Sequence, residues 1–132
     1  MDIGKVSGVS FGRCKSVLKT EWLRGNLSPQ VSKGLYGNKL TPNNISIEHL
    51  VPRNPKARLN GRPVRRGRNV LDNFALATKQ ANNARGNDPL RDHLTREQAD
   101  EYLKQFKGIK TPIFDGDSYV KRVGKTIDRL LK

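Results

Sequence analysis

The residues that could do chemistry lie in two short segments of this 132-residue chain. Residues 45–52 carry Glu48 directly before His49, which is one of only two histidines. Residues 72–87 carry Asn73 and Asn82, nine positions apart. Histidine can activate a water molecule near neutral pH, and carboxylate and amide oxygens suit a hard divalent metal. These side chains could therefore hydrolyse a phosphodiester, with a metal to balance the charge that develops on the phosphate.

The elements that must position these residues can be predicted from the surrounding pattern. In residues 44–48, Ile45 and Ile47 alternate with polar residues, which is typical of a half-buried strand. Neighbouring residues of a strand point to opposite faces. Glu48 and His49 can therefore share one site only if the strand ends or bends there, and Pro52 favours such an ending.

A second strand and a helix are predicted to follow a long loop. Residues 74–78 form an apolar strand, and residues 78–84 form a short helix. Thr78 is the predicted N-cap of this helix, and Gly86 with Asn87 marks its end. The order strand, loop, strand, helix would bring both chemistry-bearing segments together.

Three further helices are predicted outside this core. Residues 14–24 form a helix with an apolar face. A helix begins at Thr95, where Gln98 completes a capping box, and a last helix is capped by Asp117 or Ser118. We therefore expect an α+β fold in one domain, residues 1–132, with a core at about 44–88 and a C-terminal helical extension at about 95–132.

Charge is the dominant property of the composition. The chain has 26 Lys and Arg against 12 Asp and Glu, a formal net charge of +14, which suits a polyanionic partner. The densest basic run contains no acid and is broken by Pro and Gly, so it is predicted to be a loop that contacts the phosphate backbone; a solvated charge run is the alternative. Its cationic residues are Arg53, Lys56, Arg58, Arg62, Arg65, Arg66 and Arg68.

Several classes of protein are disfavoured by the sequence. No apolar run reaches the roughly 18 residues that span a bilayer, and the N-terminus lacks the apolar segment of a signal peptide, so neither a membrane partner nor secretion is expected. A single cysteine, Cys14, excludes an internal disulfide and a structural zinc site built on cysteine pairs. A cytoplasmic location is the default expectation.

The two segments resemble the motifs of a known family. Residues 48–52, Glu-His-Leu-Val-Pro, are similar to the first motif of HNH endonucleases, and Asn73, Asn82, Arg85 and Gly86 match the spacing of the second motif. The resemblance covers about a third of the chain. It implies the ββα-metal fold of the His-Me finger superfamily, here an antiparallel hairpin and a helix flanked by an N-terminal helix and two C-terminal helices. The chain resembles the small, free-standing, zinc-free members found in phages and mobile elements, which would place it in the cytoplasm of a bacterial host.

The resemblance also implies roles for particular residues. His49 would be the general base, and Asn73 would orient the loop and His49 by hydrogen bonds. Glu48 and Asn82 would hold one Mg²⁺ or Mn²⁺. Arg85 would contact a phosphate beside the metal. Some relatives carry an acid two residues before the final Asn, whereas Gln80 stands here, so weak metal binding is expected.

Simpler interpretations remain open for each residue. His49 could be structural, Glu48 could merely pair with an arginine, and Asn83 competes with Asn82 as the ligand. His93 is expected to be structural or exposed. As a whole, the chain could be an inactive basic nucleic-acid-binding module, or a nuclease for RNA or branched nucleic acid. Double-stranded DNA is the expected substrate, with low sequence specificity unless a homodimer or a protein partner supplies it.

Overall fold

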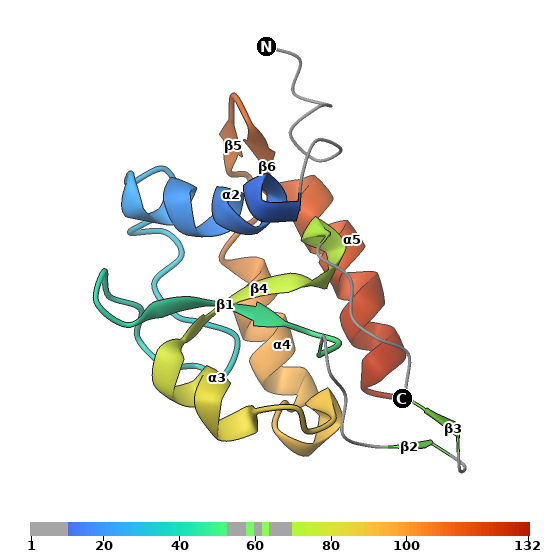
Figure 1. Cartoon of the computed structure of the whole chain (residues 1–132). Coiled ribbons are helices and arrows are strands. Elements are labelled where there is room, and N and C mark those ends of the chain that lie inside the picture. Colours follow the sequence, from blue (N-terminus) through green and yellow to red (C-terminus); the bar gives the residue numbers. More distant parts are fainter. Residues whose placement is uncertain (1–10, 53–57, 60–61, 64–69) are drawn as a thin grey trace.

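The computed structural model describes residues 11–52, 58–59, 62–63 and 70–132 (Figure 1). Residues 11–16, 58–59 and 62–63 are described through their backbone alone. The elements in chain order are α2 (Phe11–Leu23), β1 (Ile45–His49), β2 (Arg58–Leu59), β3 (Arg62–Pro63), the 3₁₀ turn η1 (Leu71–Asn73), β4 (Phe74–Thr78), α3 (Lys79–Arg85), the 3₁₀ turn η2 (Leu90–Asp92), α4 (Arg96–Lys104), β5 (Lys110–Thr111), β6 (Phe114–Asp115) and α5 (Gly116–Leu130).

The central feature is the antiparallel pair β1–β4. Its register places Ile45 opposite Thr78 at one end and His49 opposite Phe74 at the other. In Figure 1 this pair lies between α2 on one side and α3 on the other. Every residue of β4 is buried, as expected for a strand that is covered on both faces.

The outer edge of β4 is closed by groups from other segments rather than by a third strand. The amide of Leu35 donates to the Leu76 carbonyl at 2.8 Å. The Leu76 amide donates to the Tyr102 hydroxyl at 2.9 Å, and the Tyr119 hydroxyl donates to the Phe74 carbonyl at 2.6 Å. The Leu76 amide and carbonyl and the Phe74 carbonyl are therefore paired without a third strand.

The C-terminal part of the chain is a helical layer with an aromatic centre. Phe106, Phe114 and Tyr119 have ring centroids 4.8–6.1 Å apart, and the Tyr102 ring lies 5.0 Å from that of Phe106. Helix α5 packs against α4 and against η1, the turn that leads into β4. This layer therefore packs along β4, to which the Tyr102 and Tyr119 hydroxyls are hydrogen-bonded.

Most of the predicted elements are confirmed, and the α+β class is observed. Thr78 caps α3, with its hydroxyl accepting from the Ala81 amide at 3.1 Å, and Thr95 forms the predicted capping box with Gln98. Helix α2 begins three residues earlier than the predicted start at residue 14, and β1 runs one residue further, through His49. In the part of the chain that the structure describes, no helix has both the length and the apolar character needed to cross a bilayer.

Two predictions were wrong in their details. The last helix is capped by Asp115, whose carboxylate accepts from the Ser118 amide, and not by Asp117 or Ser118. Asp117 instead accepts from the Gly108 amide at 2.9 Å. The basic segment is not loop throughout, because β2 and β3 form a short antiparallel pair within it. A similar pair, β5–β6, was not predicted, since strands of two residues show no alternation.

Candidate active site

His49 is the last residue of β1 and lies at the end of the strand pair. Its side chain is half-buried, and its ring packs edge-on against Phe74, the residue opposite it, with centroids 5.0 Å apart and planes at 87°. The strand ends here, as the sequence requires if Glu48 and His49 are to serve one site. The packing against a fully buried phenyl ring restricts the imidazole on one side.

Asn73 fixes the segment that follows His49. Its side-chain oxygen accepts from the Val51 amide at 2.8 Å, and its side-chain nitrogen donates to the Val51 carbonyl at 3.0 Å. Its own carbonyl accepts from the Leu50 amide at 2.8 Å. Asn73 is 5% exposed, so these bonds are shielded from water. The predicted contact with the loop is therefore present in the geometry, while its part in catalysis stays a prediction.

Asn82 projects from α3 toward β1. Its amide nitrogen donates to the Ser46 hydroxyl at 3.2 Å and to the Ile47 carbonyl at 3.1 Å. The amide oxygen consequently points away from these two partners and could accept a ligand. Asn83, the competing candidate, is exposed on α3. The register of the helix thus brings Asn82, rather than Asn83, to β1.

Glu48 faces the protein interior. Glu48 is 2% exposed, and the Tyr36 hydroxyl donates to one oxygen of its carboxylate at 2.6 Å. The other oxygen lies 3.4 Å from a guanidinium nitrogen of Arg85. Burial raises the pKa of the Glu48 carboxyl above its usual range, whereas the Tyr36 hydrogen bond and the Arg85 charge act in the opposite direction. Burial and the nearby Glu48 charge also raise the pKa of Tyr36, which keeps its hydroxyl protonated as a donor.

Arg85 ends α3 and points back under the end of β1. It is 1% exposed, and its two terminal nitrogens donate to the His49 and Leu50 carbonyls, both at 2.8 Å. Its Nε donates to the Asp88 carbonyl at 2.9 Å. A guanidinium held in this way does not reach the surface, so the expected phosphate contact of Arg85 is not available in this arrangement.

Of the expected pair of metal ligands, Glu48 is not directed toward a metal in this arrangement, whereas the Asn82 amide oxygen could bind one. Both Glu48 oxygens already face partners, and only the Asn82 oxygen is directed away from the protein contacts described above. Among the described residues there is no group of three or more His, Cys, Asp or Glu side chains placed to hold a metal ion. The ligand role of Asn82 and the predicted Mg²⁺ or Mn²⁺ stay predictions, and the ligand role expected of Glu48 has no support in this geometry.

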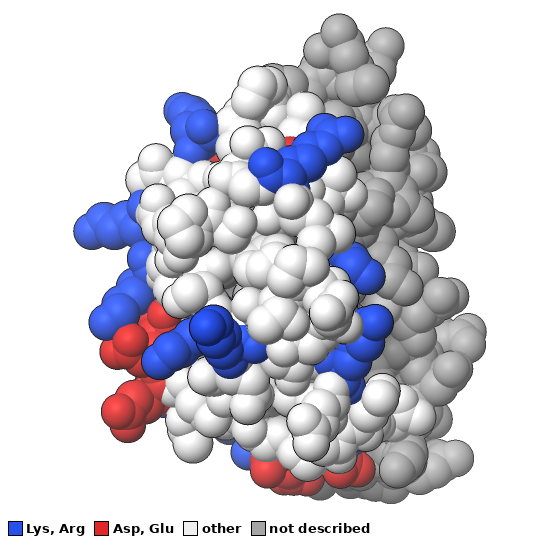
Figure 2. Space-filling view, turned by 90° about the vertical axis from the view of Figure 1, so that its left-hand side faces the viewer, with Lys and Arg blue, Asp and Glu red and all other residues white. Residues whose placement is uncertain are grey.

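The predicted nucleic-acid-binding arginines fall largely on the basic segment. Arg53, Arg65, Arg66 and Arg68 lie outside the described residues, and Arg58 and Arg62 are described through their backbone alone, in β2 and β3. On the face seen in Figure 2, Lys and Arg side chains are spread over a mostly uncharged surface, and Asp and Glu side chains lie toward its left and lower edges. This face therefore carries scattered basic side chains rather than one dense patch.

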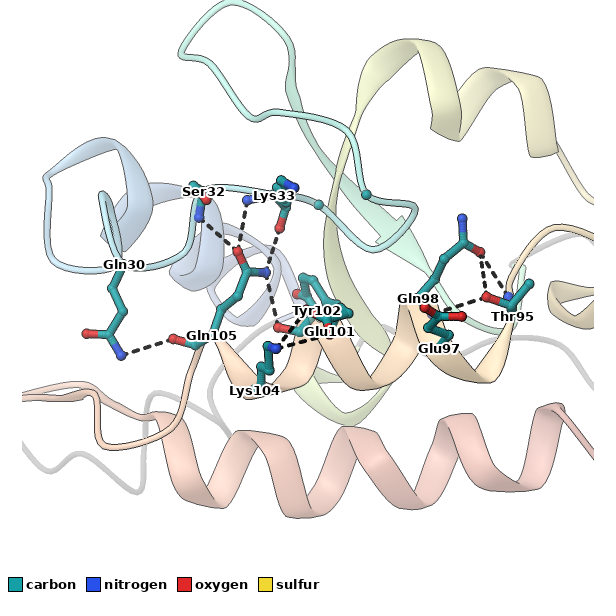
Figure 3. Close-up of a pocket in the computed structure, with 12 residues that line it drawn as sticks. Gln30, Ser32, Lys33, Thr95, Glu97, Gln98, Glu101, Tyr102, Lys104 and Gln105 are labelled. Atoms are coloured by element: carbon teal, nitrogen blue, oxygen red, sulfur yellow. Dashed lines mark hydrogen bonds and ion pairs between the residues drawn. The ribbon is translucent and has the colours of Figure 1, made fainter.

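A surface hollow of about 620 Å³ lies between the loop at residues 30–37 and α4 (Figure 3). The side chain of Gln105 crosses it: its oxygen accepts from the Ser32 and Lys33 amides, both at 3.0 Å, and its nitrogen donates to the Lys33 carbonyl at 2.9 Å. None of the predicted site residues lines this hollow. Gln105 thus connects the end of α4 to the loop at residues 32–33 by hydrogen bonds.

Sequence reasoning missed Tyr36, which closes the contact network around Glu48. Tyr36 lies twelve residues before Glu48, in a loop with no periodic pattern, so no local signal pointed to it. His93, the second histidine, bonds Asp88 at 2.9 Å, in line with the structural role expected for it. No family model matches the chain, and no curated protein or solved structure is significantly similar to it.

Proposed function

We propose that the chain is a metal-dependent endonuclease of the HNH type, which hydrolyses phosphodiester bonds in DNA by nicking or by double-strand cleavage. One observation carries the proposal. Strand β4 of the β1–β4 pair leads directly into α3. His49 ends β1, Asn73 is bonded to Val51, two residues after His49, and Asn82 of α3 is bonded to β1. Segments more than twenty residues apart in sequence thus meet as the motif resemblance implies. This geometry supports the ββα-metal fold as the finer description of the core.

The chemistry proposed for His49 follows from its side chain and position. A neutral imidazole nitrogen accepts a proton from water while the water oxygen forms a bond to phosphorus and the bond from phosphorus to the leaving oxygen breaks. The half-buried ring, restricted by Phe74, favours one orientation toward the attacking water. Asn73 supports that orientation because it fixes the backbone two residues after the imidazole.

One divalent metal, Mg²⁺ or Mn²⁺, is part of the proposal. When bound, such an ion stabilises the charge that builds on the phosphate and the leaving oxygen. The Asn82 amide oxygen is the described group best directed to hold it, since the Asn82 nitrogen is already used on β1. An amide contributes no charge, so the affinity for the metal is expected to be weak.

The proposed substrate is double-stranded DNA. A net charge of +14 on 132 residues attracts a polyanion irrespective of its sequence. Because base contacts and not phosphate contacts carry sequence information, low intrinsic specificity is expected. A homodimer or a second protein would be needed for recognition of a long sequence.

Incubation with supercoiled plasmid tests the proposal. Nicked or linear products are expected with Mg²⁺ or Mn²⁺ and not with EDTA. His49→Ala should lower the rate by about 10²–10⁴-fold, the usual contribution of a general base. His93→Ala is the matched control, because it removes the other histidine, whose partner is Asp88. If the His49→Ala protein cleaves at the wild-type rate, the assignment is wrong.

A second candidate function is a nucleic-acid-binding module without catalysis. The observation that favours it is the engagement of Glu48, which is buried between Tyr36 and Arg85 instead of facing a metal. The same plasmid experiment separates the two functions. A binding module shifts the plasmid in a gel without cutting it under any metal condition.

A further inference from the structure

The backbone at the end of β1 is held at three consecutive residues by side chains from other elements. Arg85 donates to the carbonyls of His49 and Leu50, and Asn73 pairs with both backbone groups of Val51. Arg85 belongs to α3 and Asn73 to η1, so the segment is fixed from two directions. A strand end normally frays, and here each carbonyl has a charged or bidentate partner.

Glu48 supplies the counter-charge for this arrangement. Arg85 is 1% exposed, and a buried guanidinium without a nearby anion carries a large desolvation cost. The Glu48 oxygen 3.4 Å from the Arg85 nitrogen offsets that cost from within the same strand. The nitrogen that faces Glu48 is also the one that donates to the His49 carbonyl. One nitrogen of Arg85 thus bridges the carboxylate and the His49 carbonyl, and the His49 backbone also hydrogen-bonds the carboxylate directly.

Tyr36 extends the network to a distant loop. Its hydroxyl donates to the second Glu48 oxygen at 2.6 Å, which fixes the carboxylate against rotation. The loop is held on β4 by the bond from the Leu35 amide to Leu76 and by the close approach of Gly34. A Cβ at position 34 would lie 2.9 Å from the Ala77 Cα and 3.0 Å from the Leu76 carbonyl oxygen, so glycine permits this approach.

We infer that Tyr36, Glu48 and Arg85 form a positioning device for His49, and that Glu48 acts through Arg85 rather than as a ligand of the metal. This inference rests on the proposed function for its effect on cleavage. Its structural part concerns only the orientation of the His49 ring. Both oxygens of Glu48 are engaged within the protein, and each of their partners is in turn tied to another element, Arg85 to the end of β1 and the Tyr36 loop to β4.

Nuclear magnetic resonance of the imidazole groups tests the structural part. The chain has only two histidines, and a His93→Gln variant assigns their signals. Tyr36→Phe and Glu48→Gln should each shift the His49 ring signals and leave those of His93 in place, and Arg85→Lys should also shift the His49 signals. Glu21→Gln is the matched control, since Glu21 is also 2% exposed and accepts from the Thr111 hydroxyl at 2.6 Å, away from His49. It should shift neither histidine.

Cleavage rate against Mn²⁺ concentration tests the functional part. Glu48→Gln should lower the rate at saturating Mn²⁺ by up to about 10²-fold, as for a small misplacement of a reacting group, with an unchanged metal midpoint. Tyr36→Phe should show a smaller loss of the same kind, and the double variant should be no slower than Glu48→Gln alone. Asn82→Ala should instead raise the metal midpoint. Glu21→Gln should match the wild type in both quantities once its folded fraction is measured.

Two results would overturn the inference. One is a Glu48→Gln protein whose metal midpoint rises as in Asn82→Ala, with a normal rate at saturation, because this is the behaviour of a metal ligand. The other is an unmoved set of His49 signals in the folded Tyr36→Phe and Glu48→Gln variants. If the wild-type chain cleaves nothing, the proposed function fails separately, and the His49 signals still decide whether the network holds the ring.

Discussion

The half of the molecule around β1, β4 and α3 buries charged and amide side chains in addition to the apolar core that it shares with the C-terminal half. Around β1, β4 and α3, the buried residues include Glu48, Asn73 and Arg85, which are polar or charged and bond to backbone groups or to each other. In the layer formed by α4, β5, β6 and α5, the centre is aromatic, with Phe106 and Phe114 among its members. Both halves bury apolar area, and the first half adds directional bonds that fix a short backbone segment.

This difference favours the first half as the part on which the proposed chemistry depends. A fully satisfied buried polar network holds the groups it bonds in one geometry, whereas an apolar core contributes mainly through the area it buries. The halves meet along the outer edge of β4, where the Tyr102 and Tyr119 hydroxyls satisfy the backbone of Leu76 and Phe74. We therefore expect substitutions in the first half to affect turnover and stability together, and substitutions in the second half to affect stability alone.

The largest effect is expected from Arg85→Ala. It removes the bonds to the His49 and Leu50 carbonyls and leaves Glu48 as a buried charge without its cation, which should lower the free energy of unfolding by about 3–5 kcal/mol. Urea unfolding followed by circular dichroism measures the loss. The control is Arg96→Ala, whose exposed pair with Asp128 at 2.7 Å should contribute about 0–1 kcal/mol. Equal losses for the two variants would contradict the comparison.

Asn73→Ala should have the next largest effect. Both side-chain bonds to Val51 disappear, and we expect a loss of about 1–3 kcal/mol with a fall in cleavage of about 10²-fold per folded molecule. Asn44→Ala is a close match, because the Asn44 side chain also bonds one backbone amide, at Thr41, and one carbonyl, at Lys39. It should lose stability and keep its turnover. Parallel plasmid assays and unfolding curves decide between these outcomes.

Tyr119→Phe probes the second half at its border with the first. Its hydroxyl donates to the Phe74 carbonyl at 2.6 Å, and its removal leaves that carbonyl without this donor, at a cost of about 1–3 kcal/mol. Turnover per folded molecule should stay at the wild-type level, in contrast to Tyr36→Phe, which removes the same atom from the Glu48 network. The ratio of the two cleavage rates is the measurement. A ratio of one would remove the distinction between the halves.

The two halves also differ in what the sequence could predict. Local signals identified β1, β4 and both threonine caps, because a cap involves only the next three residues. The same logic failed at α5, where Asp115, Asp117 and Ser118 all lie near the helix start. Gly116, the first residue of α5, lies against the Phe106 and Ile109 carbonyls, and this tertiary contact is not visible in the sequence.

Within the candidate site, the sequence predicted which residues come together better than it predicted where their side chains point. Spacing identified Glu48, Asn73, Asn82 and Arg85. In the structure all four lie on β1 or contact β1 or the residues directly after it. The burial of Arg85 could not be predicted, because its partners are carbonyls 35 and 36 positions earlier in the chain. One interpretation left open by the sequence, that Glu48 pairs with an arginine, is the geometry observed.

The smallest effect on stability is expected from surface charge, and here a matched pair of triple variants extends the comparison to DNA binding. Changing Arg62, Arg65 and Arg66 to Ala removes three cations from the basic segment between the two motifs, and changing Lys121, Lys125 and Arg129 removes three exposed cations from α5. Both should leave the free energy of unfolding within about 0.5 kcal/mol of the wild type.

Their effects on DNA affinity should differ. The basic segment connects two described parts of the chain that are bonded to each other, because Val51, which precedes it, pairs with Asn73 of η1, which follows it. If the segment contacts phosphates as predicted, each contact releases counterions and contributes a slope of about −0.9 to log affinity against log salt on duplex DNA. The first triple variant should therefore flatten the slope by up to about three contacts' worth, on two unrelated duplexes alike. The α5 variant carries the same change in net charge and should change the slope less.

Equal slopes for the two variants would mean that only total charge matters. A loss of affinity confined to one duplex would mean that Arg62, Arg65 and Arg66 read bases.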